Sequence, residues 1–308
     1  MRIGLAAGAA VALLLGAVAY APVAGATPNE TSPHSAAVHL EHGNGGEHGD
    51  NGNAWGHGGG GSTSNGISYH GGPVLTTGTN AYIIWYGNWA NDTATAILPD
   101  LLSHIGGSPY FNINTTYYNG ANQHVLNSVT YKQSTTDNYS QGKTNLTDNQ
   151  IASIVSTALN NKSLPVDPNG VYFVLTSADV TKTGFLSQYC GWHTYGNYGP
   201  TPIKYAFVGD PGTDWHCADQ TSASPNGNVG ADAMASVISH ELEEATTDPQ
   251  LNAWYDQRGQ ENADKCAWTF GSTYTANGAL ANMKLGTRNY LIQRNWVNAS
   301  GGYCSLSY

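Results

Sequence analysis

The stretch that decides the fold and chemistry of this chain runs from Ala231 to Cys266 and begins ADAMASVISHELEEATTDP. Asp232 stands where an acidic first-turn residue or N-cap stabilises a helix, and Pro249 ends that helix. Apolar residues recur between these points at helical spacing, which predicts an amphipathic helix. The apolar stripe consists of Ala231, Met234, Ile238, Leu242 and Ala245.

Three polar residues of this helix have the spacing of a metal site. His240 and Glu244 are four residues apart, so their side chains lie one turn apart on the same side. Glu241 follows His240 directly and would stand beside an ion held by that pair. Metalloproteases with a His-Glu-x-x-His helix use two ligands at this spacing and the intervening Glu as general base. The alternative is a solvated acidic face, but acids are scarce in this chain and concentrate here, which favours a metal.

Further ligands are expected downstream. Glu261 follows Glu244 by 17 residues, and Asp264 comes three residues later. If residues 261–264 form a helical turn, both acids face the same way, and one ligates while the other orients His240. Gluzincin-type metalloproteases have a similar arrangement. One histidine with two carboxylates is a harder ligand set than the usual zinc site. Zinc remains the first choice of cofactor, with manganese or a structural calcium as alternatives.

His193 is a further candidate, in a stretch expected to be a loop between two strands. It lies close to Cys190, so a disulfide there would fix its position. It would then reach the site as a ligand or as a donor to a developing oxyanion. The alternative is a hydrogen-bonded structural histidine.

The N-terminal residues have the pattern of a secretory signal peptide covering residues 1–26. Arg2 precedes an apolar run over residues 6–19, and the small residues 24–26 form a cleavage site. No later stretch approaches 18 consecutive apolar residues. We therefore expect a secreted, extracellular protein whose mature form does not enter the membrane.

Composition divides the remainder in two. Residues 27–68 are rich in His, Gly and Asn, which predicts a disordered segment, with weak transition-metal binding as an alternative. Residues 69–308 are expected to form the folded domain. The net charge is −10, and the 11 Lys and Arg form no basic cluster, which argues against a nucleic-acid partner.

The chain has four cysteines and no Cys-x-x-Cys pair, which disfavours a thiolate zinc site. Export favours disulfides instead. Three pairings are possible, and we favour the neighbours in sequence, Cys190–Cys217 and Cys266–Cys304.

Strand and helix patterns alternate before the Ala231 helix. Thr147 and Gln150 form a capping box ahead of one helix. The order predicts an α/β (α+β) fold with a mixed, largely parallel sheet, covering helices, a zincin-like helix after the last strand and an irregular, disulfide-tied C-terminal part. The expected strands cover residues 81–86, 125–131, 171–175 and 203–208, and the expected helices carry apolar residues from 97 to 105 and from 151 to 159.

A set of distinctive segments follows in a fixed order along the chain. These segments include Tyr69-His-Gly-Gly-Pro-Val-Leu, Ile83-Ile-Trp-Tyr-Gly-Asn-Trp89, Cys190-Gly-Trp-His193, Asn226-Gly-Asn-Val-Gly-Ala-Asp-Ala-Met234 and the stretch from Gly286 to Trp296. Together they resemble the EXORDIUM / phosphate-induced protein 1 family, and the resemblance runs from about Tyr69 to the C-terminus. Plant members of that family are extracellular, cell-wall-associated proteins linked to cell expansion, so the resemblance implies secretion and a shared fold but no settled activity. The His240-Glu241 pair departs from the plant pattern.

These observations together predict a secreted, metal-dependent hydrolase of the metallopeptidase type. Glu241 would deprotonate a metal-bound water, and the substrate would be a peptide or a cell-wall component. The alternative is a non-catalytic extracellular or cell-wall-associated protein with a structural metal site.

Overall fold

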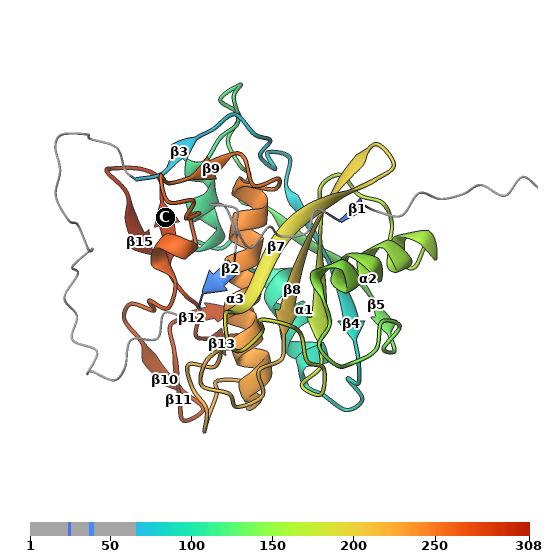
Figure 1. The fold of residues 1–308 in the computed structure, drawn as a ribbon. Helices are drawn as coiled ribbons and strands as arrows, with labels where there is room; N and C mark the ends of the chain where they lie inside the picture. Colours follow the sequence, from blue (N-terminus) through green and yellow to red (C-terminus); the bar gives the residue numbers. More distant parts are fainter. Residues whose placement is uncertain (1–23, 26–36, 40–65) are drawn as a thin grey trace, which may run out of the picture.

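The computed structural model describes residues 24–25, 37–39 and 66–308, and its centre is a seven-stranded sheet in the order β1-β7-β8-β6-β4-β5, with β2 also on β7 (Figure 1). Strands β5, β4, β6 and β8 run parallel, and β7 is antiparallel to β8. The predicted mixed, largely parallel sheet is confirmed. The strands are β1 (Ala24–Gly25), β2 (Ala37–His39), β4 (Thr79–Tyr86), β5 (Val129–Asp137), β6 (Gly170–Thr176), β7 (Tyr189–Tyr198) and β8 (Thr201–Gly209).

Helices cover both faces of the sheet, so its central strands are apolar on both sides. In β4, Ile83 belongs to one hydrophobic core and its neighbour Ile84 to the other. Helix α2 (Asp148–Asn160) packs on one face, and α1 (Ala94–His104) and α3 (Val229–Thr247) pack on the opposite face. This explains the nearly continuous apolar run of β4.

The helix starts follow from local side-chain chemistry. Both hydrogen bonds of the predicted capping box between Thr147 and Gln150 are present at the start of α2. Helix α3 starts after Asn228, whose side chain accepts a hydrogen bond from the backbone of Ala231. The suggested cap Asp232 instead lies in the first turn, where such an acid also stabilises a helix.

Two strand predictions were wrong. The stretch holding His193 is not a loop, because residues 191–198 of β7 pair with β8. Strand β5 begins at Val129 rather than Val125, since the backbone of Val125 is bonded to Tyr117 before the strand starts.

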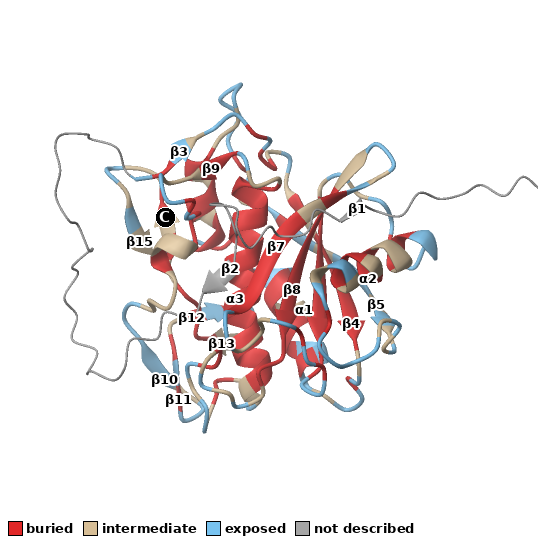
Figure 2. Cartoon of the chain, in the orientation of Figure 1, coloured by how far each residue is buried: buried red, intermediate tan, exposed pale blue. Residues whose placement is uncertain are grey.

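Helix α3 is buried on every side. Figure 1 shows it between the sheet and the C-terminal part of the chain, and Figure 2 shows it coloured as buried over its length. All residues from Gly230 to Thr247 are buried. The predicted amphipathic helix is therefore correct in its apolar stripe, but its polar face is covered rather than solvated.

Short elements in the C-terminal part of the chain cover the polar face of α3. Gln293 and Asn295 from this part are almost fully buried, as are the apolar residues Tyr290 and Ile292, which join the core under α3. The predicted irregular C-terminal part is confirmed. The elements outside the main sheet are β3 (Ser68–Tyr69), η1 (Phe111–Thr116), β9 (Trp254–Tyr255), η2 (Asp264–Cys266), β10 (Tyr274–Ala276), β11 (Ala279–Ala281), β12 (Met283–Leu285), β13 (Arg288–Tyr290), β14 (Asn295–Val297) and β15 (Tyr303–Ser305).

Both favoured disulfides are present. Cys190 pairs with Cys217, which ties β7 to the loop ahead of α3. Cys266 pairs with Cys304, which ties η2 to β15. The second bond fixes the C-terminal strand against the segment that carries the downstream acids.

The predicted signal peptide and His/Gly/Asn-rich segment lie mostly outside the described residues. Within them, the backbones of β1 and β2 pair with β7, with Ala37 opposite Trp192. Ile67 is buried in a small core with Trp254. In the part of the chain that the structure describes, no helix is long and apolar enough to cross a membrane.

Candidate metal centre

Two histidines and four acids meet between β7, the C-terminal half of α3 and the segment that enters η2. We call these six residues the histidine–carboxylate cluster. None of the ion pairs in the described residues joins a lysine or arginine to these acids. Four carboxylates therefore exceed two imidazoles, even when both imidazoles are protonated. The cluster consists of His193, His240, Glu241, Glu244, Glu261 and Asp264.

His193 faces α3 from the sheet. It lies opposite Ala206, whose side chain belongs to the core on the α3 side. The Nδ1 atom of His193 is 3.5 Å from Glu241 Oε2 and 3.4 Å from Glu244 Oε2. Its Nε2 atom is 3.8 Å from Glu261 Oε1. The ring therefore stands between acids from two different segments.

His240 meets a different pair of oxygens. Its Nε2 atom is 3.0 Å from Glu244 Oε1 and 3.5 Å from Asp264 Oδ1. The backbone N–H of Asp264 donates to Glu244 Oε1 at 3.1 Å, and that of Glu261 donates to Asp264 Oδ2 at 3.2 Å. These bonds hold the downstream segment against α3.

The six predicted residues thus come together, but not in the predicted arrangement. Asp264 opens η2, and the backbone N–H of Lys265 donates to the backbone oxygen of Glu261, so the two acids share one helical turn but do not face the same way. Asp264 lies beside His240 and Glu244, and Glu261 lies beside His193. Metal-ligand groupings follow this division: His240, Glu244 and Asp264 form one, and His193, Glu244 and Glu261 the other, with ligand atoms within 4.8 Å in each.

Many polar atoms of the cluster are buried and have no hydrogen-bond partner among the residues that the structure describes. They include both oxygens of Glu241, Oε2 of Glu244, Oε1 of Glu261, Nδ1 of His193 and both ring nitrogens of His240. An unpaired buried polar group costs about 1–3 kcal/mol, and folded proteins contain few of them. Ligands that surround a shared cation bring nitrogen and oxygen atoms close together without hydrogen-bond geometry, and the cluster shows this pattern. The donor set therefore fits a divalent ion.

Burial and neighbouring charges shift the pKa values of the cluster. Burial lowers the pKa of His193, but Glu241 and Glu244 outweigh it and raise this pKa to about 10. Burial raises the pKa of Glu244, but His240 and His193 outweigh it and bring this pKa to about 2. Glu244 is therefore the most strongly anionic member.

Glu241 titrates differently. Burial, followed by the charge of Glu244, raises its pKa to about 7, although the nearby His193 acts in the opposite direction. A carboxyl group that titrates near neutral pH is suited to general-base work at that pH.

Sequence reasoning missed three neighbours. Glu243 is fully buried on α3, and Asn295 of β14 donates a hydrogen bond to its Oε2 atom. Asp248 caps α3 and accepts backbone hydrogen bonds from Asn252 and Ala253. The two residues lie beside the predicted ligands; the partner of Glu243 comes from the distant strand β14, and the partners of Asp248 come from the turn that follows α3.

The third neighbour is Gly191. A Cβ atom there would lie 2.5 Å from Val237 and 3.1 Å from Glu241 Oε1. Only glycine lets β7 approach α3 so closely, and this approach brings His193 to the cluster. The glycine two residues before the candidate histidine was the available sequence clue.

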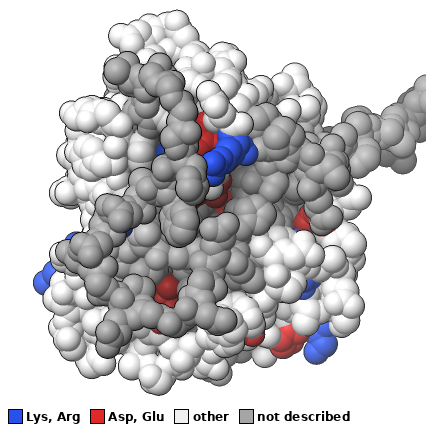
Figure 3. Space-filling model, turned by 60° about the vertical axis from the view of Figure 1, so that its left-hand side comes forward, with Lys and Arg blue, Asp and Glu red and all other residues white. Residues whose placement is uncertain are grey.

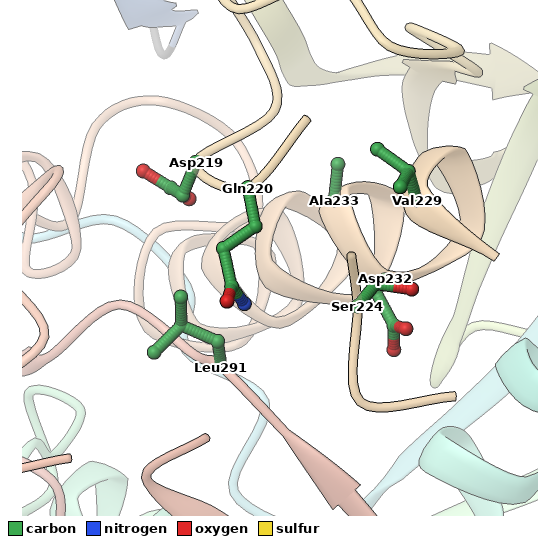
Figure 4. A pocket seen from close by; sticks show the side chains of 7 residues that line it. All are labelled: Asp219, Gln220, Ser224, Val229, Asp232, Ala233 and Leu291. Atoms are coloured by element: carbon green, nitrogen blue, oxygen red, sulfur yellow. The ribbon is translucent and has the colours of Figure 1, made fainter. Parts of the chain in front are cut away.

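A separate small pocket lies near the start of α3 (Figure 4). Asp232, one of its two acids, is held by hydrogen bonds from Asn226. Asp232 precedes His240 by eight residues, which is roughly 12 Å along a helix, so the pocket is not the cluster. The pocket is lined by Asp219, Gln220, Ser224, Val229, Asp232, Ala233 and Leu291.

The face of the molecule in Figure 3 carries scattered Lys and Arg side chains.

Fold and site together define an α/β protein with a buried histidine–carboxylate cluster on a central helix. Residues 67–290 match the family model for the phosphate-induced protein 1 conserved region, and the chain belongs to that family.

Among curated relatives, Protein EXORDIUM-like 3 of Arabidopsis thaliana is 32% identical over 282 residues, covering 78% of this chain and 82% of the relative. Protein EXORDIUM-like 5 is 31% identical over 279 residues, covering 75% of each chain. Protein EXORDIUM is 26% identical over 230 residues, covering 64% of this chain and 70% of the relative. These are Arabidopsis thaliana proteins as well. No solved structure matches the chain significantly.

Proposed function

We propose that this family member is a secreted, metal-dependent hydrolase. The observation that carries the proposal is the cluster itself, in which buried ligand atoms lack partners and carboxylates outnumber imidazoles. A divalent cation supplies both the missing partner and the missing charge. Secretion is supported by the two disulfides, which form in oxidising compartments.

The ligands of the catalytic ion are His240 Nε2, Glu244 Oε1 and Asp264 Oδ1. This group is favoured because Asp264 is its least buried member, with a side chain 10% exposed. Zinc is the first choice, and the two oxygen donors also suit manganese or calcium. A bound ion of this kind lowers the pKa of a coordinated water toward neutrality.

Glu241 and His193 carry the proton chemistry. Glu241 follows the ligand His240 on α3, and its unpaired carboxylate oxygens accept the proton of the attacking water. His193 Nδ1 lies 3.5 Å from Glu241 Oε2, and its imidazolium donates to the negative charge that develops on the substrate oxygen. The substrate class is a peptide or a cell-wall component.

One observation favours a non-catalytic alternative, in which an extracellular or wall-associated protein holds a structural ion. His193, His240, Glu241, Glu244 and Glu261 are each 3% exposed or less. A catalytic site needs a route for substrate, whereas a structural ion is best held where water is excluded.

Two matched variants separate these functions. Glu241→Gln keeps the size of the side chain and removes the base. Glu243→Gln makes the same change at a neighbouring buried residue outside the proposed ligand set. Hydrolysis of peptide and cell-wall polymer libraries should fall in the first variant alone, with metal content unchanged in both.

A purified wild-type protein that contains a stoichiometric ion but hydrolyses neither library supports the structural alternative. A protein that binds no zinc, manganese or calcium contradicts the proposal in both forms.

A further inference from the structure

The cluster contains one carboxylate that faces both histidines. Glu244 Oε1 is 3.0 Å from His240 Nε2, and Glu244 Oε2 is 3.4 Å from His193 Nδ1. We infer that the cluster is a two-cation centre in which Glu244 bridges a first ion at His240 and Asp264 and a second ion at His193 and Glu261. The inference rests on the proposed function for its first ion; the second ion is new, and it takes His193 as a neutral ligand in place of the oxyanion donor.

The second ion has its own set of ligands. His193, Glu244 and Glu261 each offer an atom within 4.8 Å of the others, independently of His240 and Asp264. They come from β7, α3 and the segment before η2, so three parts of the fold converge on this point. A carboxylate that bridges through both oxygens holds two ions about 3.5–4 Å apart.

A single ion at His240 leaves polar atoms on the other side of Glu244 without partners. Glu244 Oε2, Glu261 Oε1 and His193 Nδ1 are buried and unpaired, and their residues are at most 3% exposed. Such atoms are rare in folded proteins because each one costs free energy. A second ion satisfies them together.

A protonated His193 is the competing explanation. Its ring nitrogens lie 3.4 to 3.8 Å from the surrounding carboxylate oxygens, and Nδ1 makes no hydrogen bond. Its Nε2 atom is closer to the backbone oxygen of Asp248, at 3.3 Å, than to Glu261. An imidazolium in this position therefore leaves both Glu244 Oε2 and Glu261 Oε1 unpaired.

Charge balance also favours two ions. The four carboxylates of the cluster match two divalent cations when both histidines are neutral, as metal ligands are. If all four carboxylates are ionised, one divalent ion leaves the buried site with an excess of two negative charges, and no lysine or arginine of the described residues pairs with these acids. Each ion would have one imidazole and two carboxylates, a set suited to manganese or zinc.

The test is titration of the metal-stripped full chain with Mn²⁺, followed by electron paramagnetic resonance at saturation. The wild type should bind two Mn²⁺ per chain and give the spectrum of an exchange-coupled pair. Glu261→Gln and Asp264→Asn should each bind one ion and give the six-line spectrum of isolated Mn²⁺. Glu243→Gln is the matched control and should behave as the wild type.

One Mn²⁺ per chain in the wild type, unchanged by Glu261→Gln, would overturn the second ion and leave the proposed function standing. Two uncoupled ions that both persist in Glu261→Gln would also overturn it, because the second would lie elsewhere. A wild type that binds no Mn²⁺, Zn²⁺ or Ca²⁺ would contradict the proposed function itself.

Discussion

The chain buries charge on both faces of its sheet, and the two places differ in how that charge is balanced. On the α2 side, Lys182 is 5% exposed and pairs with Asp148. Its ammonium group also donates to the hydroxyl of Tyr189 and lies over the rings of Trp192 and Phe207. One cation therefore meets one carboxylate, with further polar and aromatic partners.

On the α3 side, four carboxylates meet two histidines, and seven of their polar atoms have no hydrogen-bond partner. The Lys182 site shows that this fold can pair a buried lysine with an acid. No lysine or arginine of the described residues pairs with the cluster, and burying uncompensated charge costs several kcal/mol. The proposed cation would supply this balancing charge from outside the chain.

The largest effect is expected from removing a ligand that α3 supplies. His240→Ala takes away the imidazole and leaves Glu244 and Asp264 facing each other in the core. We expect loss of the bound ion and destabilisation by about 3–5 kcal/mol, as when one member of a buried pair is removed. Urea unfolding and metal analysis measure the two effects. Unchanged metal content together with unchanged stability would remove His240 from the site.

The second effect concerns activity rather than stability. Glu241→Gln should retain the ion and the wild-type unfolding midpoint, yet lower the turnover of any substrate by about a hundredfold, the scale of a general base. Steady-state kinetics of the purified variant provide the measurement. Full activity in Glu241→Gln would assign the base to another residue.

A smaller effect should appear on the opposite face. Lys182→Met breaks the pair with Asp148, whose side chain is 23% exposed and so recovers some hydration. We expect a loss of about 1–3 kcal/mol in urea unfolding. The loss should be equal with and without a chelator, because this site supplies its own counter-charge. A loss that depends on the chelator would break the contrast between the two faces.

The smallest effect is a pH dependence. Burial lowers the pKa of Lys204 to about 8 from its usual 10.5, against the opposing charge of Asp167. Between these values the unfolded chain binds more protons than the folded protein, so stability rises with pH. Lys204→Met should remove this rise, on the order of 2 kcal/mol between pH 8 and 10.5. Parallel pH profiles of unfolding free energy in wild type and variant would contradict it.

Local patterns predicted the parts of the fold that local chemistry determines. The capping box at Thr147 and the apolar stripe of α3 depend on neighbouring residues, and both are present. The favoured disulfide partners were also correct, since short separations limit the choice. The pairing of one strand with another could not be predicted from local patterns in the same way.

Strand β7 shows why. It carries Gly191 and Gly196 among aromatic and polar residues, so no clear alternation marks it as a strand. Its extended form comes from pairing with β8, and Gly191 has the further purpose of allowing close contact with α3. His193 was identified as a candidate, but its place on a strand depended on these contacts.

The candidate site was predictable to a similar degree. Helical periodicity put His240, Glu241 and Glu244 on one side of α3, and the structure brings all three to the cluster. Periodicity could not predict that Glu261 and Asp264 separate toward different histidines. That division depends on an irregular turn held by backbone hydrogen bonds to the acids themselves.

The central claim is that the cluster is balanced by a cation from outside the chain. Metal analysis of the wild-type protein, joined to thermal unfolding with and without a strong chelator, tests it most directly. We predict stoichiometric divalent metal and a fall in melting temperature on the order of 10 °C when it is removed, since an ion bound only to the folded state stabilises that state. A protein that contains no metal, and whose melting temperature is the same with chelator, Zn²⁺, Mn²⁺ or Ca²⁺, would contradict the claim.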